Sequence, residues 1–258
     1  VQNYTIATYT NSNTNGQPST LIACDSDKTA FLSGFFVQDC MAQLERQAAA
    51  GDNGYYDVAS TVPEAGVQLE QWQIINHTDW ELNDDIVIRN IFSYANLKTT
   101  NSADLFGLNL IQPNGGEKVF ATAGVRPGLP TTSQNSLVEE LQIQGSSFDG
   151  RLAWQGGIYY EYSDPDEDSG SQSPAQIICD LGTLNTRDPA NFRCDAMFGL
   201  SNVQLSEQGV EYDNRAIYSQ ATYDINDQLS VTGGARYTCD ETKGYSRDTL
   251  FFFDSDGI

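Results

Sequence analysis

The stretch that decides the fold class is YDNRAIYSQATYDINDQLSVTGGARYTCDE, residues 212–241. In its second half, apolar or small side chains alternate with polar ones from Leu229 to Thr238. A period of two indicates a β-strand, because successive side chains of a strand point to opposite sides of a sheet. The first half alternates in the same way, and residues 224–227 separate the halves as a tight turn. The sequence therefore predicts a hairpin with arms of about ten residues, which suits a tilted membrane-spanning strand or a long soluble hairpin.

Two more hairpins precede this one. Residues 71–80 and 86–97 alternate around a turn at 83–85, and residues 137–145 and 152–162 alternate around a turn at 147–150. The second turn contains Asp149-Gly150, which is a strong turn signal. We also expect a strand over residues 1–9, a short helix over residues 41–50 and the start of another strand at residues 251–253. The remaining connections, including residues 99–135 and 163–209, are long and polar.

Short turns on one side of the predicted sheet and long polar loops on the other are typical of outer-membrane β-barrels. Soluble sandwiches keep their connections short at both ends. The sequence has no run of about 20 apolar residues, so a spanning helix is not expected. We therefore predict an all-β antiparallel meander of long amphipathic hairpins that is part of a large transmembrane β-barrel, with short periplasmic turns and long extracellular loops.

The charge balance excludes some partners. The chain carries 35 acidic and 13 basic residues, for a formal net charge of −22. Nucleic-acid binding requires a basic surface, so a nucleic-acid partner is not expected. Attachment to anionic lipid by charge alone is disfavoured for the same reason. The acidic balance fits a solvated surface or a mouth that attracts cations.

The five cysteines indicate an oxidising compartment. Proximity in the sequence favours two disulfides, Cys24 with Cys40 and Cys179 with Cys194, and each would tie together one polar loop. A zinc site is the alternative, but the chain has no CxxC motif and one histidine. Cys239 is left over near the end of a predicted strand.

Three phrases carry a resemblance to a known family. They are EQWQIINHTDWELNDDIVIRNIFSY (residues 70–94), VEELQIQGSSFDGRLAWQGGIYYEY (residues 138–162) and SQATYDINDQLSVTGGARYTCDE (residues 219–241). In this order they resemble barrel hairpins of TonB-dependent outer-membrane receptors, and the third phrase is the most specific. Together they cover most of the predicted strand residues and little of the loops.

The resemblance implies a closed barrel of roughly 22 strands around a plug in the outer membrane of a Gram-negative cell. It also implies energy-coupled uptake of a scarce ligand, such as a ferric siderophore, cobalamin or a glycan. TonB, powered by ExbB and ExbD, would act through the plug. We identify no plug and no closing strands in residues 1–258, so we expect this piece to be a partial barrel domain of a longer protein.

The alternation also predicts which side chains face which environment. The face that carries Leu229 and Val231 would meet lipid. The candidate aromatic girdle near the short turns is Trp80, Trp154 and Tyr223, with cross-strand packing in a soluble sheet as the alternative. The candidate lumen-facing residues are Arg89, Glu140, Glu161 and Arg236, which could line the lumen, contact a plug or pair with one another. We interpret His77, which has no triad or ligand set around it, as structural.

No catalytic or cofactor motif is present, so an enzyme and a cofactor are not expected. The acidic run at residues 164–168 has the carboxylates that calcium prefers, but it lacks the EF-hand pattern and is interpreted as a solvated loop. The expected partners are outer-membrane lipid, TonB with ExbB and ExbD, and a small-molecule or iron-chelate ligand. A secreted all-β binding or adhesion module and a passive porin are the alternative functions.

Overall fold

The computed structural model describes residues 1–16, 19–24, 33–51, 58, 65–104, 107, 110–111, 117–125, 128–179, 183, 188–192, 194–196 and 201–253. Seven long strands form its framework: β1 (Gln2–Thr14), β2 (Gly66–Asn83), β3 (Ile86–Asp104), β6 (Thr132–Ser147), β7 (Leu152–Asp164), β10 (Ser201–Asn226) and β11 (Leu229–Phe253). They lie side by side in the order β1-β2-β3-β6-β7-β10-β11, and every neighbouring pair is antiparallel. The predicted all-β meander of long hairpins is confirmed.

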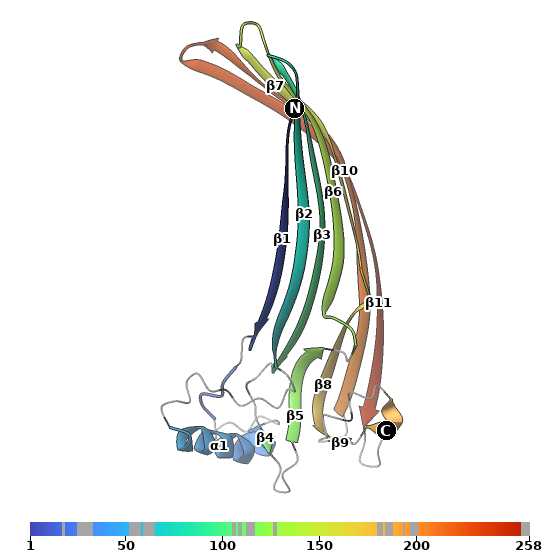
Figure 1. The fold of residues 1–258 in the computed structure, drawn as a ribbon. Coiled ribbons are helices and arrows are strands. Elements are labelled where there is room, and N and C mark those ends of the chain that lie inside the picture. The colour runs from blue at the N-terminus through green and yellow to red at the C-terminus, as the bar shows by residue number, and fades with distance from the viewer. Residues whose placement is uncertain are drawn as a thin grey trace.

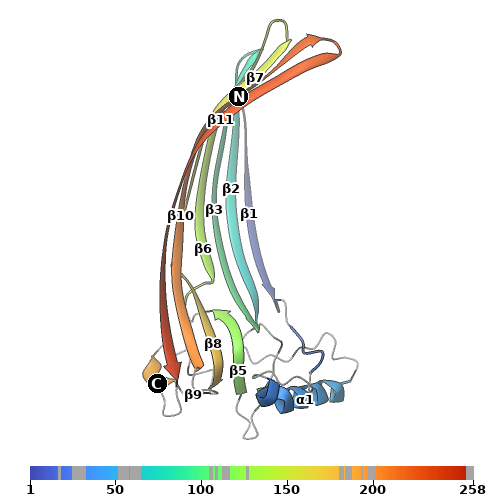
Figure 2. The ribbon, with the colours of Figure 1, turned by 180° about the vertical axis from the view of Figure 1, so that it is seen from behind.

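The sheet is long, curved and open (Figure 1). The three tight turns β2–β3, β6–β7 and β10–β11 lie together at one end, and the N-terminus lies near them. At the other end lie the helix α1 (Ser33–Ala49), the short strands and the end of β11; the view from behind shows the same arrangement (Figure 2). We call these the turn end and the loop end.

Each tight turn follows from its residues. Asn83 and Asn226 accept hydrogen bonds in their side chains from backbone nitrogens two residues later, at Asp85 and Gln228, both at 2.9 Å. This is the local bond by which asparagine stabilises turns. In the β6–β7 turn, Phe148, Asp149 and Gly150 all have φ between 55° and 85°. Glycine adopts this region without strain and aspartate tolerates it, which explains the Asp-Gly signal.

The loop end contains more strand than the sequence predicts. The additional strands are β4 (Leu110–Ile111), β5 (Glu117–Val125), β8 (Ser169–Cys179) and β9 (Cys194–Ala196). β7 and β8 pair with successive parts of β10, so the acidic run is an irregular break between them rather than the opening of a long loop. Phe251–Phe253 ends β11, opposite residues 201–203 of β10, and does not begin another strand. The helix predicted over residues 41–50 is present and begins earlier, at Ser33.

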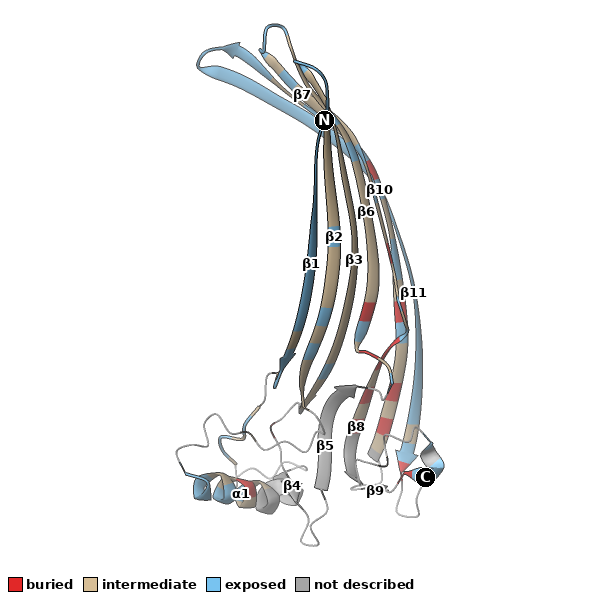
Figure 3. Ribbon diagram, viewed as in Figure 1, coloured by how far each residue is buried: buried red, intermediate tan, exposed pale blue. Residues whose placement is uncertain are grey.

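Buried side chains are few and gather near the loop end, mainly on β8, β10 and β11 (Figure 3). Val203, Leu205 and Phe253 form an apolar cluster there, together with Phe192, which follows a 3₁₀ helix (Pro189–Asn191). The Phe192 ring lies 5.7 Å from the Phe251 ring and 6.3 Å from the Phe253 ring, between centroids. No helix in the described part of the chain is long and apolar enough to cross a membrane.

The register gives the sheet two chemically different faces. Residues directly opposite each other on neighbouring strands point to the same side, so the pairings extend each face from β1 to β11. The apolar face includes Trp72, Ile74, Trp80, Ile88, Phe92, Tyr94, Leu141, Ile143, Trp154, Ile158, Tyr162, Ile217, Tyr223, Val231 and Tyr237. The polar face includes Gln73, His77, Asp79, Arg89, Glu140, Gln142, Gln155, Tyr159, Glu161, Tyr218, Gln220, Thr232 and Arg236.

Candidate functional site

One row of the polar face crosses all seven long strands. In strand order it contains Gln2, Asp79, Arg89, Gln142, Gly157, Tyr218 and Arg236. Arg89 and Arg236 thus lie in the same row, four strand steps apart, which is about 19 Å at the usual strand spacing. Both arginines predicted from the sequence lie on the polar face. Glu140 lies one row of that face nearer the loop end, and Glu161 lies two rows nearer.

Three of the predicted residues belong to one cluster, which we call the tyrosine–arginine cluster: Glu140, Tyr159, Glu161, Tyr218 and Arg236. The Tyr218 hydroxyl donates a hydrogen bond to Glu140 Oε1, and the Tyr159 hydroxyl donates to Glu161 Oε2 at 2.9 Å. The Arg236 guanidinium lies 5.3 Å from the centroid of the Tyr159 ring and 5.8 Å from that of the Tyr218 ring. Cations are attracted to the faces of such rings.

Arg236 is exposed and forms no ion pair with a described residue, although its Nε donates to Thr238 Oγ1 at 3.1 Å. Each cluster carboxylate accepts a hydrogen bond from a tyrosine instead of pairing with the arginine. The guanidinium therefore presents a positive charge on the polar face while two aromatic rings support it. Guanidinium groups bind carboxylates and phosphates with paired hydrogen bonds, so the cluster can bind an acidic group that approaches this face.

Gly157 makes the cluster possible. It lies directly opposite Tyr218 on β10 and Gln142 on β6. A Cβ atom at this position would lie 2.6 Å from the Tyr218 hydroxyl oxygen. The absence of a side chain lets the Tyr218 ring cross over β7 and reach Glu140 on β6.

A second polar group lies on β1, β2 and β3 and includes the fourth predicted residue, Arg89. Arg89 Nε donates to Asp79 Oδ1 at 2.7 Å and Arg89 Nη2 donates to Asp79 Oδ2 at 3.0 Å, which is a bidentate ion pair. His77 Nε2 lies 2.9 Å from Asp79 Oδ1, and His77 Nδ1 lies 2.5 Å from the Tyr4 hydroxyl. The contacts of His77 are those of a side chain held within a polar network. Sequence reasoning missed Tyr4, Asp79, Tyr159 and Tyr218 as partners.

The three candidate girdle residues lie on the apolar face. Trp80 is 54% exposed and Tyr223 is 43% exposed. The Trp154 indole packs over Gly145, where a Cβ atom would lie 2.4 Å from its Cζ2, and its Nε1 donates to Ser147 Oγ at 3.2 Å. At the loop end of the same face, Trp72 and Tyr94 pack with ring centroids 5.3 Å apart.

The acidic run between β7 and β8 is bonded to three different strands. Asp166 accepts a hydrogen bond from Asn135 at 3.1 Å, Glu167 forms an ion pair with Lys98, and Asp168 accepts a bond from the Tyr245 hydroxyl. The bond to Asp168 raises the pKa of Tyr245. Because these carboxylates point to different partners, they do not converge on one point. Among the residues that the structure describes, no group of three or more His, Cys, Asp or Glu is placed to hold a metal ion.

Two of the cysteines predicted to pair do so: Cys24 and Cys40 form a disulfide with a Cα–Cα distance of 6.0 Å, which ties α1 to the segment after β1. Cys179 and Cys194 are directly opposite each other on β8 and β9. Their side chains lie outside the described part of the structure. Cys239 is a free, exposed thiol on the apolar face of β11.

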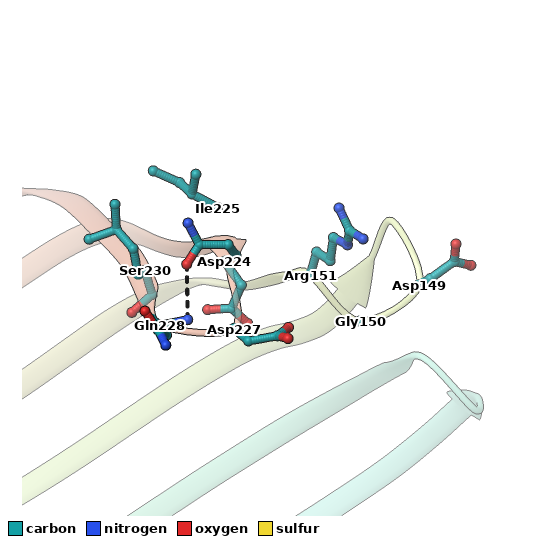
Figure 4. A pocket seen from close by; sticks show the side chains of 10 residues that line it. Asp149, Gly150, Arg151, Asp224, Ile225, Asp227, Gln228 and Ser230 are labelled. Atoms are coloured by element: carbon teal, nitrogen blue, oxygen red, sulfur yellow. Dashed lines mark hydrogen bonds between the residues drawn. The ribbon is translucent and has the colours of Figure 1, made fainter.

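A hollow of about 640 Å³ lies at the turn end, between the β6–β7 and β10–β11 turns. Residues 149–151 and 224–230 line it (Figure 4). The backbone nitrogen of Asp224 donates to the Arg151 carbonyl at 2.8 Å, which holds the two turns together. In Figure 4 the side chains of Asp149 and Arg151 point away from each other, so these two charged groups do not form one site.

Comparisons with known proteins give a distant structural similarity. No protein-family model matches the sequence, and no curated protein matches it. The structure is similar to the crystal structure of the ferric yersiniabactin uptake receptor FyuA from Yersinia pestis, with a TM-score of 0.45 and 12% sequence identity. The similarity covers 75% of this chain and 26% of the receptor chain, so this chain spans about a quarter of that receptor's length. A similarity of this size assigns no site residue.

Proposed function

We propose that this sheet is a sector of a transmembrane β-barrel in the outer membrane of a Gram-negative cell, with its apolar face against lipid. The observation that carries the proposal is the division of the six strands from β2 to β11 in the main sheet order into one apolar and one polar face. On β2 the apolar band is bounded by Trp80 near the turn end and Trp72 near the loop end. Tryptophan and tyrosine favour both membrane interfaces, so such boundaries are the expected girdles.

The girdle residues form a diagonal across the strands. Tyr223 on β10 pairs with Leu152 on β7. Trp154, also on β7, lies two residues nearer the loop end than this pair. Trp154 lies in the same row as Ile86 of β3, whereas Trp80 pairs with Ile88. Trp80 therefore lies two residues nearer the loop end than Trp154. Four residues over four strand steps are about 13 Å along the strands and about 19 Å across them. A line at constant depth would then correspond to a strand tilt of about 35°, within the range of transmembrane barrels.

The thickness of the band fits the same arrangement. Trp72 and Trp80 are eight residues apart, which is about 26 Å along a strand and about 22 Å along the membrane normal at that tilt. The outward apolar band of such barrels is about 25 Å tall. The turn end would face the periplasm and the loop end would face outward.

The edges of the sheet also support a larger barrel. β1 pairs only with β2 and β11 pairs along its length with β10, so the outer edges of β1 and β11 are unpaired among the described residues. In a bilayer every backbone amide needs a partner, and a closed barrel provides one. Further strands would therefore join these two edges. Residues 1–258 would form a partial barrel domain.

The finer proposal is energy-coupled uptake of a scarce ligand, a ferric siderophore, cobalamin or a glycan, with TonB, ExbB and ExbD as partners. The three phrases that resemble TonB-dependent receptors are the three hairpins with tight turns. In this arrangement Arg89, Glu140, Glu161 and Arg236 would face the lumen, where the exposed Arg236 could bind an acidic group of a plug or a ligand. The long connections would contact the ligand first.

Uptake by cells tests this function against its alternatives. The intact gene is deleted in its native host, and uptake of labelled ferric siderophores, cobalamin and oligosaccharides is compared with and without a proton uncoupler. A receptor predicts a loss of uptake of one ligand on deletion and an equal loss with the uncoupler. A passive porin would lose uptake on deletion but not with the uncoupler. A secreted module would be absent from outer-membrane fractions, which would contradict the proposal.

A further inference from the structure

A small polar pocket lies at the loop end of the sheet, on the face that carries Trp72 and Tyr94. Its volume is about 200 Å³, and β1, β2 and β3 form it. Its polar lining residues are Asn11, Asn13, Gln68, Glu70, Lys98 and Thr100. The register places all six in two successive rows of this face, directly beyond the row of Trp72. We call these six residues the amide pocket.

The amide pocket would lie at the membrane surface in the arrangement proposed above. On β2, Glu70 and Gln68 lie two and four residues beyond Trp72. At the proposed tilt these separations are about 5 Å and about 11 Å along the membrane normal, and a step to β1 or β3 changes the depth by about 3 Å. The headgroup layer on each side of the hydrocarbon core is about 5–7 Å thick. The pocket therefore opens at the level of the headgroups and of the water just beyond them, and it faces away from the lumen.

The amide pocket keeps hydrogen-bonding groups that the chain itself does not use. On its membrane side, Asn11 Nδ2 donates to the Tyr9 hydroxyl at 3.3 Å, and this hydroxyl donates to Glu70 Oε1 at 3.2 Å. Neither Gln68 Nε2 nor the side-chain amide of Asn13 has a hydrogen-bond partner among the described residues. Asn13 and Gln68 are directly opposite each other, and both are exposed. Two neighbouring amides therefore offer donors and acceptors to a molecule in the pocket.

The charges of the amide pocket favour a neutral ligand. Lys98 is the one basic residue of its lining and forms an ion pair with Glu167, so its charge is not available to a phosphate or a carboxylate. Glu70 is the one acidic residue of the lining, whereas a hard cation takes six or more oxygen ligands. At the loop end of β10 and β11 the same face carries carboxylates instead, such as Asp213 and Glu241. The concentration of neutral amides is thus a property of β1 and β2.

We propose that the amide pocket binds a neutral sugar ring at the outer surface of the membrane. Each hydroxyl of such a ring is both a donor and an acceptor, and an amide side chain offers both roles on one planar group. The opposed amides of Asn13 and Gln68 can therefore bond neighbouring hydroxyls of one ring. The volume of about 200 Å³ is below the ~300–1,000 Å³ of sites for drug-sized ligands, so the pocket takes one ring rather than a chain of them. Glycolipid headgroups and free saccharides both carry such rings.

Lipid retention tests the proposal, which rests on the membrane orientation proposed above. The full-length protein is placed in phosphatidylcholine nanodiscs that contain a minor share of monoglucosyl and monogalactosyl diacylglycerol, and native mass spectrometry counts the lipids that it retains. Asn13→Ala/Gln68→Ala is compared with Thr10→Ala/Gln71→Ala, a directly opposed pair on the polar face of the same two strands. We expect the first double variant to lower glycolipid retention about ten-fold, since it loses two hydrogen-bonding amides. The control should retain as much glycolipid as the unmodified protein.

Three results of this comparison would overturn the proposal. The first is glycolipid retention no greater than the retention of phosphatidylcholine. The second is an equal loss of retention in both double variants, because the effect would then not come from the pocket. The third is equal retention of phosphatidylglycerol when it replaces the glycolipids, because the ligand would then not be a neutral sugar ring.

Methyl glucoside and methyl galactoside in solution distinguish the source of the ring. Their binding to the full-length protein is measured by saturation-transfer NMR in a detergent that has no sugar headgroup. Glycoside binding that is lost in Asn13→Ala/Gln68→Ala would show that the ring alone is recognised, whereas glycolipid retention without glycoside binding would assign the ring to a membrane lipid. The absence of both would refute the pocket while leaving the membrane location intact. Glycoside binding by a protein that is absent from the outer-membrane fraction would instead refute the membrane location.

Discussion

Gly157 lies under the ring of Tyr218, and its missing side chain is what gives that ring its path to Glu140. We predict that Gly157→Ala lowers the free energy of unfolding by about 1–2 kcal/mol, because the added Cβ displaces the ring and breaks its hydrogen bond. The measurement is urea-induced unfolding of the full-length protein in lipid vesicles.

The matched control is Gly233→Ala. Gly233 lies on β11, and a Cβ atom built there has no neighbour within 4 Å. Alanine is no worse than glycine in a strand, so this variant should change the stability by less than about 0.5 kcal/mol. If both variants behave alike, the contact of Tyr218 with Gly157 has no role in stability.

At this scale the sequence predicts the face of a residue better than its contacts. Alternation places Arg89, Glu140, Glu161 and Arg236 on polar sides of their strands, and the structure places all four on one face. The contacts depend on register between strands, which alternation within a strand does not contain. Tyr159 and Glu161 were detectable, because residues two apart on a strand share a face and can bond.

Among the elements, the tight turns are the best predicted because their signals are local. Asn226 of the β10–β11 turn bonds the backbone nitrogen of Gln228. We predict that Asn226→Ala costs about 0.5–1 kcal/mol of unfolding free energy, since this donor loses its acceptor. The check is the urea midpoint of unfolding. Gln228→Ala keeps the backbone bond and serves as the control. Equal effects of the two substitutions would show that the asparagine side chain does not stabilise the turn.

The strand between residues 169 and 179 was missed for a physical reason. Its sequence, SGSQSPAQIIC, has no alternation and contains Pro174, which disfavours a strand assignment. Pairing with β10 on one side and β5 on the other nevertheless makes it a strand. The loop-side halves of β10 and β11 were also missed. Val203 and Leu205 alternate there, but polar and charged residues surround them, and the pairing of the two strands with each other defines the strands.

The acidic run between β7 and β8 shifts the pKa of Tyr245, and this shift can be measured. The hydrogen bond to Asp168 raises the pKa of Tyr245 above its usual value of about 10. Because the folded-state pKa is the higher one, the bond contributes stability fully below pH ~10 and loses it as the pH rises through the folded-state value. We predict that Asp168→Asn lowers the pKa of Tyr245 towards its usual value. Difference absorbance against Tyr245→Phe in each background isolates this phenol.

Asp166→Asn is the matched control for this titration. Asp166 belongs to the same acidic run, but its hydrogen-bond partner is Asn135 rather than Tyr245. The titration of Tyr245 should therefore remain unchanged in this variant. A shift of the same size in both variants would mean that the net charge of the run, and not the bond to Asp168, raises the pKa.

For the whole molecule, the two faces of the sheet reconcile a net charge of −22 with the proposed membrane location. The carboxylates of the long strands lie mostly on the polar face or beyond the apolar band, at the loop end. Glu139, on the apolar face of β6, is the exception on that strand. The formal charge of the chain is therefore a property of its two solvated surfaces and says little about the band between them.

The final prediction concerns the depth of the apolar band in the proposed membrane. In variants that retain a single tryptophan, Trp72 and Trp80 should each be quenched most by lipids labelled near the headgroup, because they lie at opposite interfaces about 22 Å apart. Tryptophan introduced as Ile158→Trp, between the two girdles on the same face, should be quenched most by lipids labelled near the end of the acyl chain. A tryptophan introduced as Gln155→Trp, on the polar face, should be quenched weakly by both. Equal quenching at Ile158 and Gln155 would mean that the two faces do not separate lipid from lumen, and the barrel arrangement would then be wrong.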